Sequence, residues 1–138
     1  AASLSDCDAM IAAAAASGTQ LGVISQRRLF QPVARSKQAV DSGKIGNPIL
    51  GVIQMFSWRD EAYYASDPWR GKWDTEGGGV LVNQAPHQLD ILLWLMGQVA
   101  EVSAYWSNLS HPYIEVEDTA VAPIRFRSGA LGSLVVSL

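Results

Sequence analysis

The 138-residue sequence has a single cysteine, Cys7, and only 17% charged residues. One cysteine excludes an internal disulfide and a cysteine-based metal cluster, and it fits a reducing compartment such as the cytoplasm. No run of five or more basic residues occurs and the net charge is −3, so a nucleic-acid partner is not expected. No segment is long enough and free enough of charge to span a membrane, so a membrane partner is not expected either.

Hydrophobic residues make up 49% of the chain, which is enough for a packed core. The alanine-rich start lacks the basic region of a signal peptide and is better explained as a helix, because alanine has the highest helix propensity. Ser5 can serve as its N-cap, Asp6 and Asp8 complement the helix dipole, and Gly18 ends it.

Helix and strand patterns alternate in the first half of the chain, and strands cluster in the second. In chain order, we expect a buried strand at 21–25, a helix from Pro32 to about Gly43, a strand at 49–58, a long loop at 58–79, a buried helix ending at Gly97, and strands at 99–108, 117–126 and 130–138, the last two joined at Ser128-Gly129. This order predicts the end of an α/β unit followed by an α+β domain with a largely antiparallel open sheet. The chain stops inside strand-like sequence and looks truncated at both ends.

The most informative polar residues are Asn83, His87 and Asp90. In a helix their spacing of four and three places all three on one face of an otherwise apolar segment. An imidazole titrates near neutral pH, so His87 suits proton transfer, with Asn83 and Asp90 as hydrogen-bonding neighbours. The alternative is a structural role, in which His87 only caps or bridges buried backbone groups. A metal site is not expected, since one His and one Asp do not make a zinc site and His111 lies in a separate loop.

Two further features of the loop stand out. The run Gly77-Gly78-Gly79 lacks the spacing of a phosphate-binding loop and predicts instead a close backbone approach or a flexible helix entry. Aromatic residues interleave with cations between 58 and 73, among them Trp69, Arg70 and Trp73. These side chains either stack on a sugar or nicotinamide ring or anchor the loop to the core.

Taken together, these segments resemble the Gfo/Idh/MocA family of oxidoreductases. The resemblance is carried by GGGVLVNQAPHQLDILLWLMG and, in the same order as in the family, by QRRLFQPVARSKQAVDSGKIGNPI, DPWRGKW and EDTAVAPIRFRSGALGSL. It implies that residues 1–28 are the last helix and strand of an N-terminal Rossmann domain. Residues 29–138 would then be the first part of the C-terminal substrate and oligomerisation domain.

The resemblance also implies roles for individual residues. His87 would be catalytic, with Asn83 beside it in a position that the family often fills with aspartate, so an aspartate at that position is expected to be tolerated. Asp90, Arg28 and Trp73 would bind substrate. Trp69 and Arg70 would approach the cofactor, NAD or NADP, whose main binding site lies outside this chain.

The function implied is hydride transfer between the nicotinamide cofactor and a sugar, cyclitol or related hydroxyl or carbonyl compound. The isolated chain is expected to be inactive, the full-length protein to be a cytoplasmic dehydrogenase, and the sheet to form a homo-oligomer. Two alternatives stay open: a non-catalytic sugar-binding or regulatory protein on the same fold, and a structural oligomerisation module.

Overall fold

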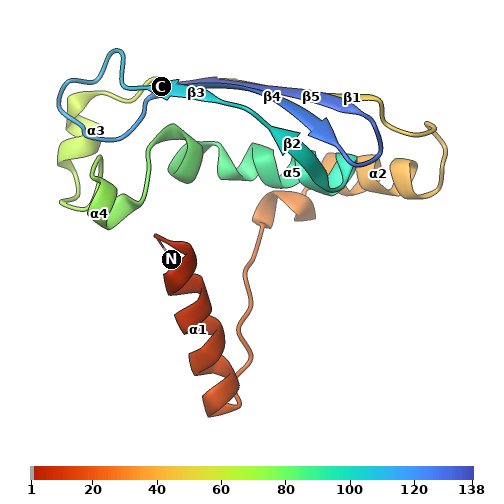
Figure 1. The fold of residues 1–138 in the computed structure, drawn as a ribbon, viewed down its shortest axis with the longest axis horizontal. Coiled ribbons are helices and arrows are strands. Elements are labelled where there is room, and N and C mark those ends of the chain that lie inside the picture. The colour runs from red at the N-terminus through yellow and green to blue at the C-terminus, as the bar shows by residue number, and fades with distance from the viewer. Residues whose placement is uncertain (1) are drawn as a thin grey trace.

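The computed structural model describes residues 2–138, which form one sheet backed by helices on one face (Figure 1). The elements in chain order are α1 (Leu4–Ser17), a 3₁₀ turn (Gln26–Leu29), α2 (Gln31–Asp41), β1 (Leu50–Phe56), α3 (Glu61–Ala65), α4 (Trp73–Glu76), a π turn (Val80–Gln84), α5 (Pro86–Met96), β2 (Val99–Val102), β3 (Tyr105–Ser107), β4 (Thr119–Phe126) and β5 (Leu131–Ser137).

The sheet has five strands in the order β1-β5-β4-β2, and β3 also pairs with β4. Only the β1–β5 pair is parallel, while every pair involving β4 is antiparallel. The predicted α+β architecture with a largely antiparallel open sheet is therefore confirmed. The predicted strand at 99–108 is divided into β2 and β3.

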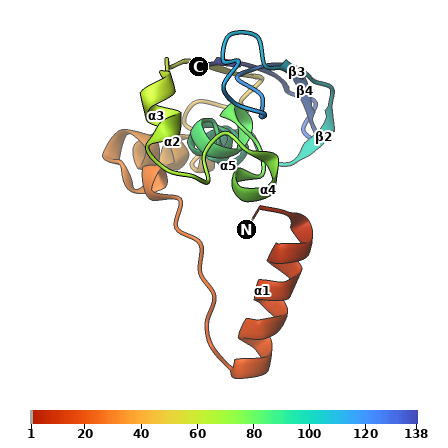
Figure 2. The ribbon, with the colours of Figure 1, turned by 90° about the vertical axis from the view of Figure 1, so that its left-hand side faces the viewer.

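The core lies between the sheet and α5, which runs beneath it (Figure 2). Burial alternates along β4 and β5, so one face of each strand supplies core side chains such as Phe126. The helix can sit this close because Gly51 has no side chain: a Cβ there would lie 2.5 Å from Cδ1 of Leu92. The residues of α5 are otherwise mostly half-buried, and Leu92 is its one buried residue. The prediction of a buried helix is therefore wrong for most of its residues.

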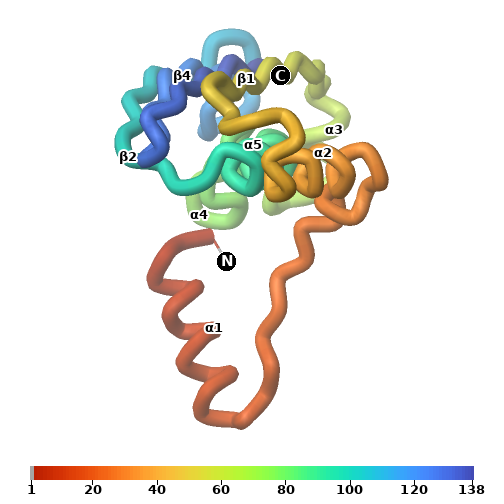
Figure 3. The backbone as a smooth tube through the Cα atoms, turned by 90° about the vertical axis from the view of Figure 1, so that its right-hand side faces the viewer, coloured from red at the N-terminus to blue at the C-terminus, as the bar shows by residue number. Residues whose placement is uncertain are grey.

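The N-terminal segment stands apart from this core (Figure 3). Helix α1 has no buried residue, and its N-cap is Ser3 rather than the expected Ser5: the Ser3 hydroxyl accepts from the Asp6 backbone and the Asp6 carboxylate accepts from the Ser3 backbone. Gly18 ends the helix in the left-handed conformation, as expected (φ 67°).

The buried strand expected at 21–25 is not formed. These residues are extended and mostly exposed, and the Val23 side chain is 91% exposed. A strand is stabilised by pairing with a neighbour, and within residues 2–138 no strand pairs with this segment. No helix of residues 2–138 has the length and apolar character needed to cross a membrane.

Candidate active site

The entry to α5 is held by a buried acid, Glu117, which lies two residues before β4. Gly79 lies so close to it that a Cβ would fall 1.9 Å from the Glu117 carbonyl oxygen. That carbonyl accepts from the Val80 N–H at 2.9 Å, and the carboxylate accepts from the N–H groups of Gly79 at 2.9 Å and Leu81 at 3.0 Å. Because Glu117 is only 2% exposed, these contacts fix the start of the helix. The close backbone approach predicted for the glycine run is confirmed.

Asn83 lies in the π turn that precedes α5. Its Nδ2 donates to Oε1 of Glu76, whose other carboxylate oxygen accepts from the Gly71 N–H at 2.5 Å. Glu76 ends the short helix α4 and is 9% exposed. The Asn83 amide is therefore held by a buried charge.

His87 and Asp90 lie in the first two turns of α5, both half-buried, but they differ in their partners. Asp90 forms a bidentate pair with Arg28, from Nε at 2.7 Å and Nη2 at 2.5 Å, and the Arg28 guanidinium lies 5.0 Å from the Trp94 ring centroid. The Arg28 hydrogen bonds, opposed by partial burial, hold the pKa of Asp90 below its ordinary value. Within residues 2–138 no hydrogen bond joins His87 to Asn83 or Asp90.

The structure thus brings Arg28 and Asp90 together, places Asn83 on Glu76, and leaves the His87 ring without a hydrogen-bond partner in the described part of the chain. A cavity of about 430 Å³ lies between α2, β1 and α5. Its helix wall is the neighbouring face with Gln88 and Leu92, not the face with Asn83 and His87.

Arg70 contacts two aromatic rings, those of Tyr63 and Trp69. Its guanidinium carbon lies 4.3 Å from the Tyr63 centroid and 4.4 Å from the Trp69 centroid. It also donates to the Tyr63 hydroxyl at 2.6 Å and to Asp67 at 3.1 Å. These contacts hold Arg70 against Trp69, which is 39% exposed.

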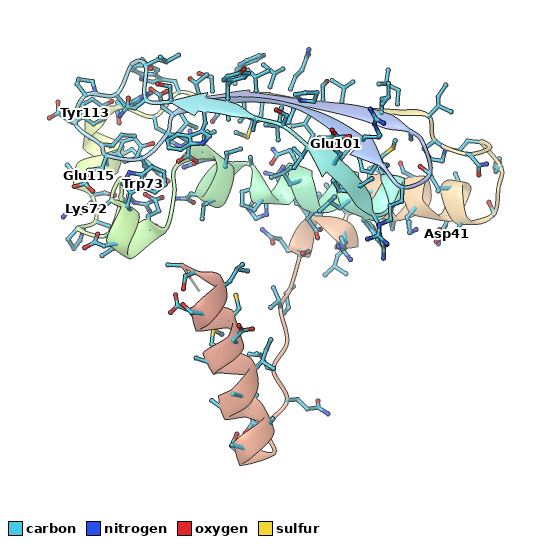
Figure 4. All side chains as sticks on the ribbon, viewed as in Figure 1. Asp41, Lys72, Trp73, Glu101, Tyr113 and Glu115 are labelled. Carbon is cyan, nitrogen blue, oxygen red and sulfur yellow. The ribbon has the colours of Figure 1, made fainter. Side chains whose placement is uncertain are left out.

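Trp73 is tied to a second loop. Its Nε1 donates to the Glu115 carbonyl oxygen at 3.0 Å, and its ring packs edge-on against Trp106. Figure 4 shows Trp73 and Glu115 together at the end of the molecule opposite Asp41. Since Trp73 is 43% exposed, it anchors the loop and still presents ring surface.

A buried network at this same end joins the loop at 59 to the segment before β4. His111 Nε2 faces the Arg59 carbonyl oxygen at 2.8 Å, and Nδ1 faces Oδ2 of Asp118 at 2.7 Å. The Asp118 carboxylate also accepts from the backbone of Leu109 and Ser110 and from the Ser110 hydroxyl. Burial disfavours the Asp118 carboxylate, but hydrogen bonds from His111 and from this loop outweigh it and hold its pKa well below the ordinary range.

Sequence reasoning missed Glu76, Glu117, His111 and Asp118. The one available signal was that these acids directly precede apolar or glycine-rich residues, Glu117-Asp118 before β4 and Glu76 before the glycine run. An acid that is buried in such a place needs hydrogen-bond donors. Within residues 2–138 no group of three or more His, Cys, Asp or Glu side chains is arranged to hold a metal ion.

Comparisons with known proteins agree on one family. A model described as the GFO/IDH/MocA C-terminal domain matches residues 33–138. Myo-inositol 2-dehydrogenase of Thermotoga maritima is 35% identical over 133 residues, which are 94% of this chain and 37% of that protein. A 1-carboxy-3-chloro-3,4-dihydroxycyclo hexa-1,5-diene dehydrogenase of Comamonas testosteroni is 32% identical over 135 residues, 97% of this chain and 33% of that protein.

Among solved structures, the WlbA dehydrogenase of Bordetella pertussis, in complex with NADH and UDP-GlcNAcA, matches 99% of this chain and 42% of its own. Its TM-score is 0.92 and its sequence identity 38%. The chain spans about a third of the length of the curated relatives that it matches.

Proposed function

Because the chain belongs to the Gfo/Idh/MocA family, we propose that the protein of which it forms part is an NAD(P)-dependent oxidoreductase acting on a sugar, cyclitol or related hydroxyl or carbonyl compound. The observation that carries the proposal is the half-buried His87 ring, which has no hydrogen-bond partner within residues 2–138 and follows an amide held by Glu76. The relatives described above are named as dehydrogenases, and the solved one holds NADH and UDP-GlcNAcA.

In this proposal His87 moves the proton of the reacting hydroxyl, and Asn83 offers a hydrogen bond to the same substrate. The nicotinamide cofactor, when bound, supplies the hydride chemistry. Asp90 and Arg28 form two hydrogen bonds with each other. We propose that this pair supports the substrate site by holding α5 against the turn at 26–29. Trp73 lines the substrate side through its exposed ring surface.

The described residues fit only part of a cofactor site. Exposed Trp69, backed by Arg70, offers a stacking surface. Within residues 2–138 no glycine-rich loop joins a strand to a helix in the manner of a dinucleotide-binding fingerprint. We therefore propose that the pyrophosphate and ribose sites lie in an N-terminal Rossmann domain and that the chain alone is inactive. Residues 1–28 would supply the last helix of that domain and the extended segment at 21–25, which would become its last strand by pairing with a strand outside this chain.

We further propose a homo-oligomer formed through the open face of the sheet, which no helix of residues 2–138 covers (Figures 1 and 4). Register places apolar side chains together on that face, as in the pair of Leu50 and Leu131. The exposed apolar residues on this face are Leu50, Val52, Phe56, Val121 and Leu131. An apolar surface of this kind favours association with a second copy.

Exposed, unpaired Cys7 fits the cytoplasm, the compartment that we propose.

The test is steady-state turnover by the full-length protein with NAD⁺ or NADP⁺ and a panel of sugars, cyclitols and nucleotide sugars. His87→Ala should lower kcat/KM by roughly 10²- to 10⁴-fold, the range for losing a general acid–base group, with little change in cofactor affinity. Leu93→Ala, at an exposed position of the same helix, is the matched control. Near-normal turnover by His87→Ala would assign His87 a structural role, and sugar binding without turnover by the wild type would favour the regulatory alternative.

A further inference from the structure

In the contact between Glu76 and Asn83, the amide donates the hydrogen bond and the carboxylate accepts it. Glu76 has one carboxylate oxygen on the Gly71 N–H and the other on Nδ2 of Asn83, and it is almost wholly buried. The two donors come from different segments, the aromatic loop and the π turn before α5. Both oxygens of the acid are therefore committed to donors.

This contact decides which way the Asn83 amide points. The nitrogen and oxygen ends of an amide have nearly the same shape, so only hydrogen bonding distinguishes its two orientations. A carboxylate accepts and cannot donate, so the nitrogen must face Glu76. Since the amide is planar, its oxygen points away from Glu76 and stays available as an acceptor.

We propose that Glu76 is a positioning residue of the active site, which acts through Asn83 by presenting the Asn83 side-chain oxygen, and never its NH₂ group, to a hydroxyl of the substrate. This inference rests on the proposed function. It deepens that function by naming the chemistry recognised: a substrate hydroxyl that donates a hydrogen bond beside His87.

The contact also reverses the expectation that aspartate is tolerated in place of Asn83. An aspartate there would put two carboxylates against each other in a buried place, which is strongly unfavourable. A glutamine in place of Glu76 would remove the conflict, because its oxygen can accept from Gly71 and its NH₂ group can donate to the new carboxylate. The substitutions Glu76→Gln and Asn83→Asp should therefore be tolerated only when they are made together.

The experiment is a double-mutant cycle in the full-length enzyme with Glu76→Gln, Asn83→Asp and the double variant. We expect each single variant to lose about 10- to 100-fold in kcat/KM, mainly in kcat, because a misplaced group at the reacting centre costs about this much. The double variant should return to within about threefold of the wild type. Glu115→Gln, the same substitution at an exposed site nearby, should have no effect.

Denaturant midpoints of the same four proteins separate positioning from folding. Coupling in kcat/KM that exceeds the coupling in stability supports the proposal. If Asn83→Asp does not fold, a loss of kcat in the folded Glu76→Gln variant that the double variant recovers supports it instead. Additive losses in kcat/KM, or coupling seen in stability alone, would overturn it. A wild-type enzyme without turnover on any substrate would instead show that the proposed function has failed, since the stability cycle still reports the Glu76–Asn83 contact.

Discussion

The N-terminal segment and the sheet end of the molecule use apolar residues in different ways. Helix α1 is rich in alanine and buries nothing, and the apolar residues that follow it are largely exposed. Strands β4 and β5 bury every second residue in the core. Apolar residues therefore form a helix without buried side chains in one region and a packed core in the other.

The difference lies in how far the stabilising contacts reach along the chain. Helix α1 is held by the reciprocal hydrogen bonds of Ser3 and Asp6 and by Gly18, all within or next to the helix. At the sheet end, Glu117 reaches back 38 residues to the Gly79 N–H. Changes at the sheet end should therefore cost far more free energy of unfolding than changes in α1.

The largest effect is expected from Asp118→Ala. This change leaves the His111 ring, the Ser110 hydroxyl and two backbone N–H groups without their buried acceptor, and each buried donor left without an acceptor costs about 1–3 kcal/mol. Denaturant unfolding followed by tryptophan fluorescence measures it. Asp41→Ala breaks an exposed pair with Lys37 and should cost about 0.3–0.5 kcal/mol. Equal losses in the two variants would remove the contrast between buried and exposed pairs.

Part of this stabilisation should depend on pH. The folded-state pKa of Asp118 is lowered, so its contribution is fully present above the unfolded pKa of about 3.9 and is lost as pH falls below that value. The stability difference between wild type and Asp118→Asn should therefore shrink between about pH 5 and pH 2. Unfolding midpoints of both proteins across that interval are the measurement, and a constant difference would mean that the carboxylate is not preferentially ionised in the fold.

Replacing one glycine in each region by alanine compares the stability of the sheet end with that of the N-terminal segment. Gly79→Ala forces a Cβ to within 1.9 Å of the Glu117 carbonyl oxygen and should cost about 1–3 kcal/mol or more. Gly22→Ala meets nothing within 4 Å and should be neutral or stabilising by up to about 1 kcal/mol, because it restricts the unfolded chain. Thermal unfolding measures the stability change in both variants. A clear loss of stability in Gly22→Ala would show that the N-terminal segment makes contacts that this structure lacks.

An effect confined to the N-terminal segment should come from the cap of α1. Ser3→Ala removes the hydroxyl that accepts from Asp6 and should weaken this helix by about 1 kcal/mol. Amide hydrogen exchange in the 138-residue chain should rise in α1 and stay unchanged in β4 and β5. Ser5→Ala, which leaves the cap intact, is the control, and the reverse ranking of the two serines would restore Ser5 as the N-cap.

The strand and helix patterns could be predicted because they are local. The helix ending near Gly43, the strand at 49–58 and the turn at Ser128-Gly129 depend on periodicity and turn residues, and all three are present. The strand at 21–25 could not be judged in this way, because apolar residues become a strand only when another strand pairs with them. The parallel pairing of β1 with β5, which lie far apart in the chain, left no local signal either.

The sequence by itself determined the α+β class of the fold, the family resemblance, and the candidate set of Asn83, His87 and Asp90, because those follow from residue types at fixed spacing. Only the tertiary structure decided what each of the three residues contacts. Asp90 is bound by Arg28, and Asn83 is oriented by Glu76. The reason is that hydrogen-bond partners distant in the chain are chosen by how the elements pack, and a buried acid such as Glu76 or Glu117 takes its donors from whichever segments that packing brings to it.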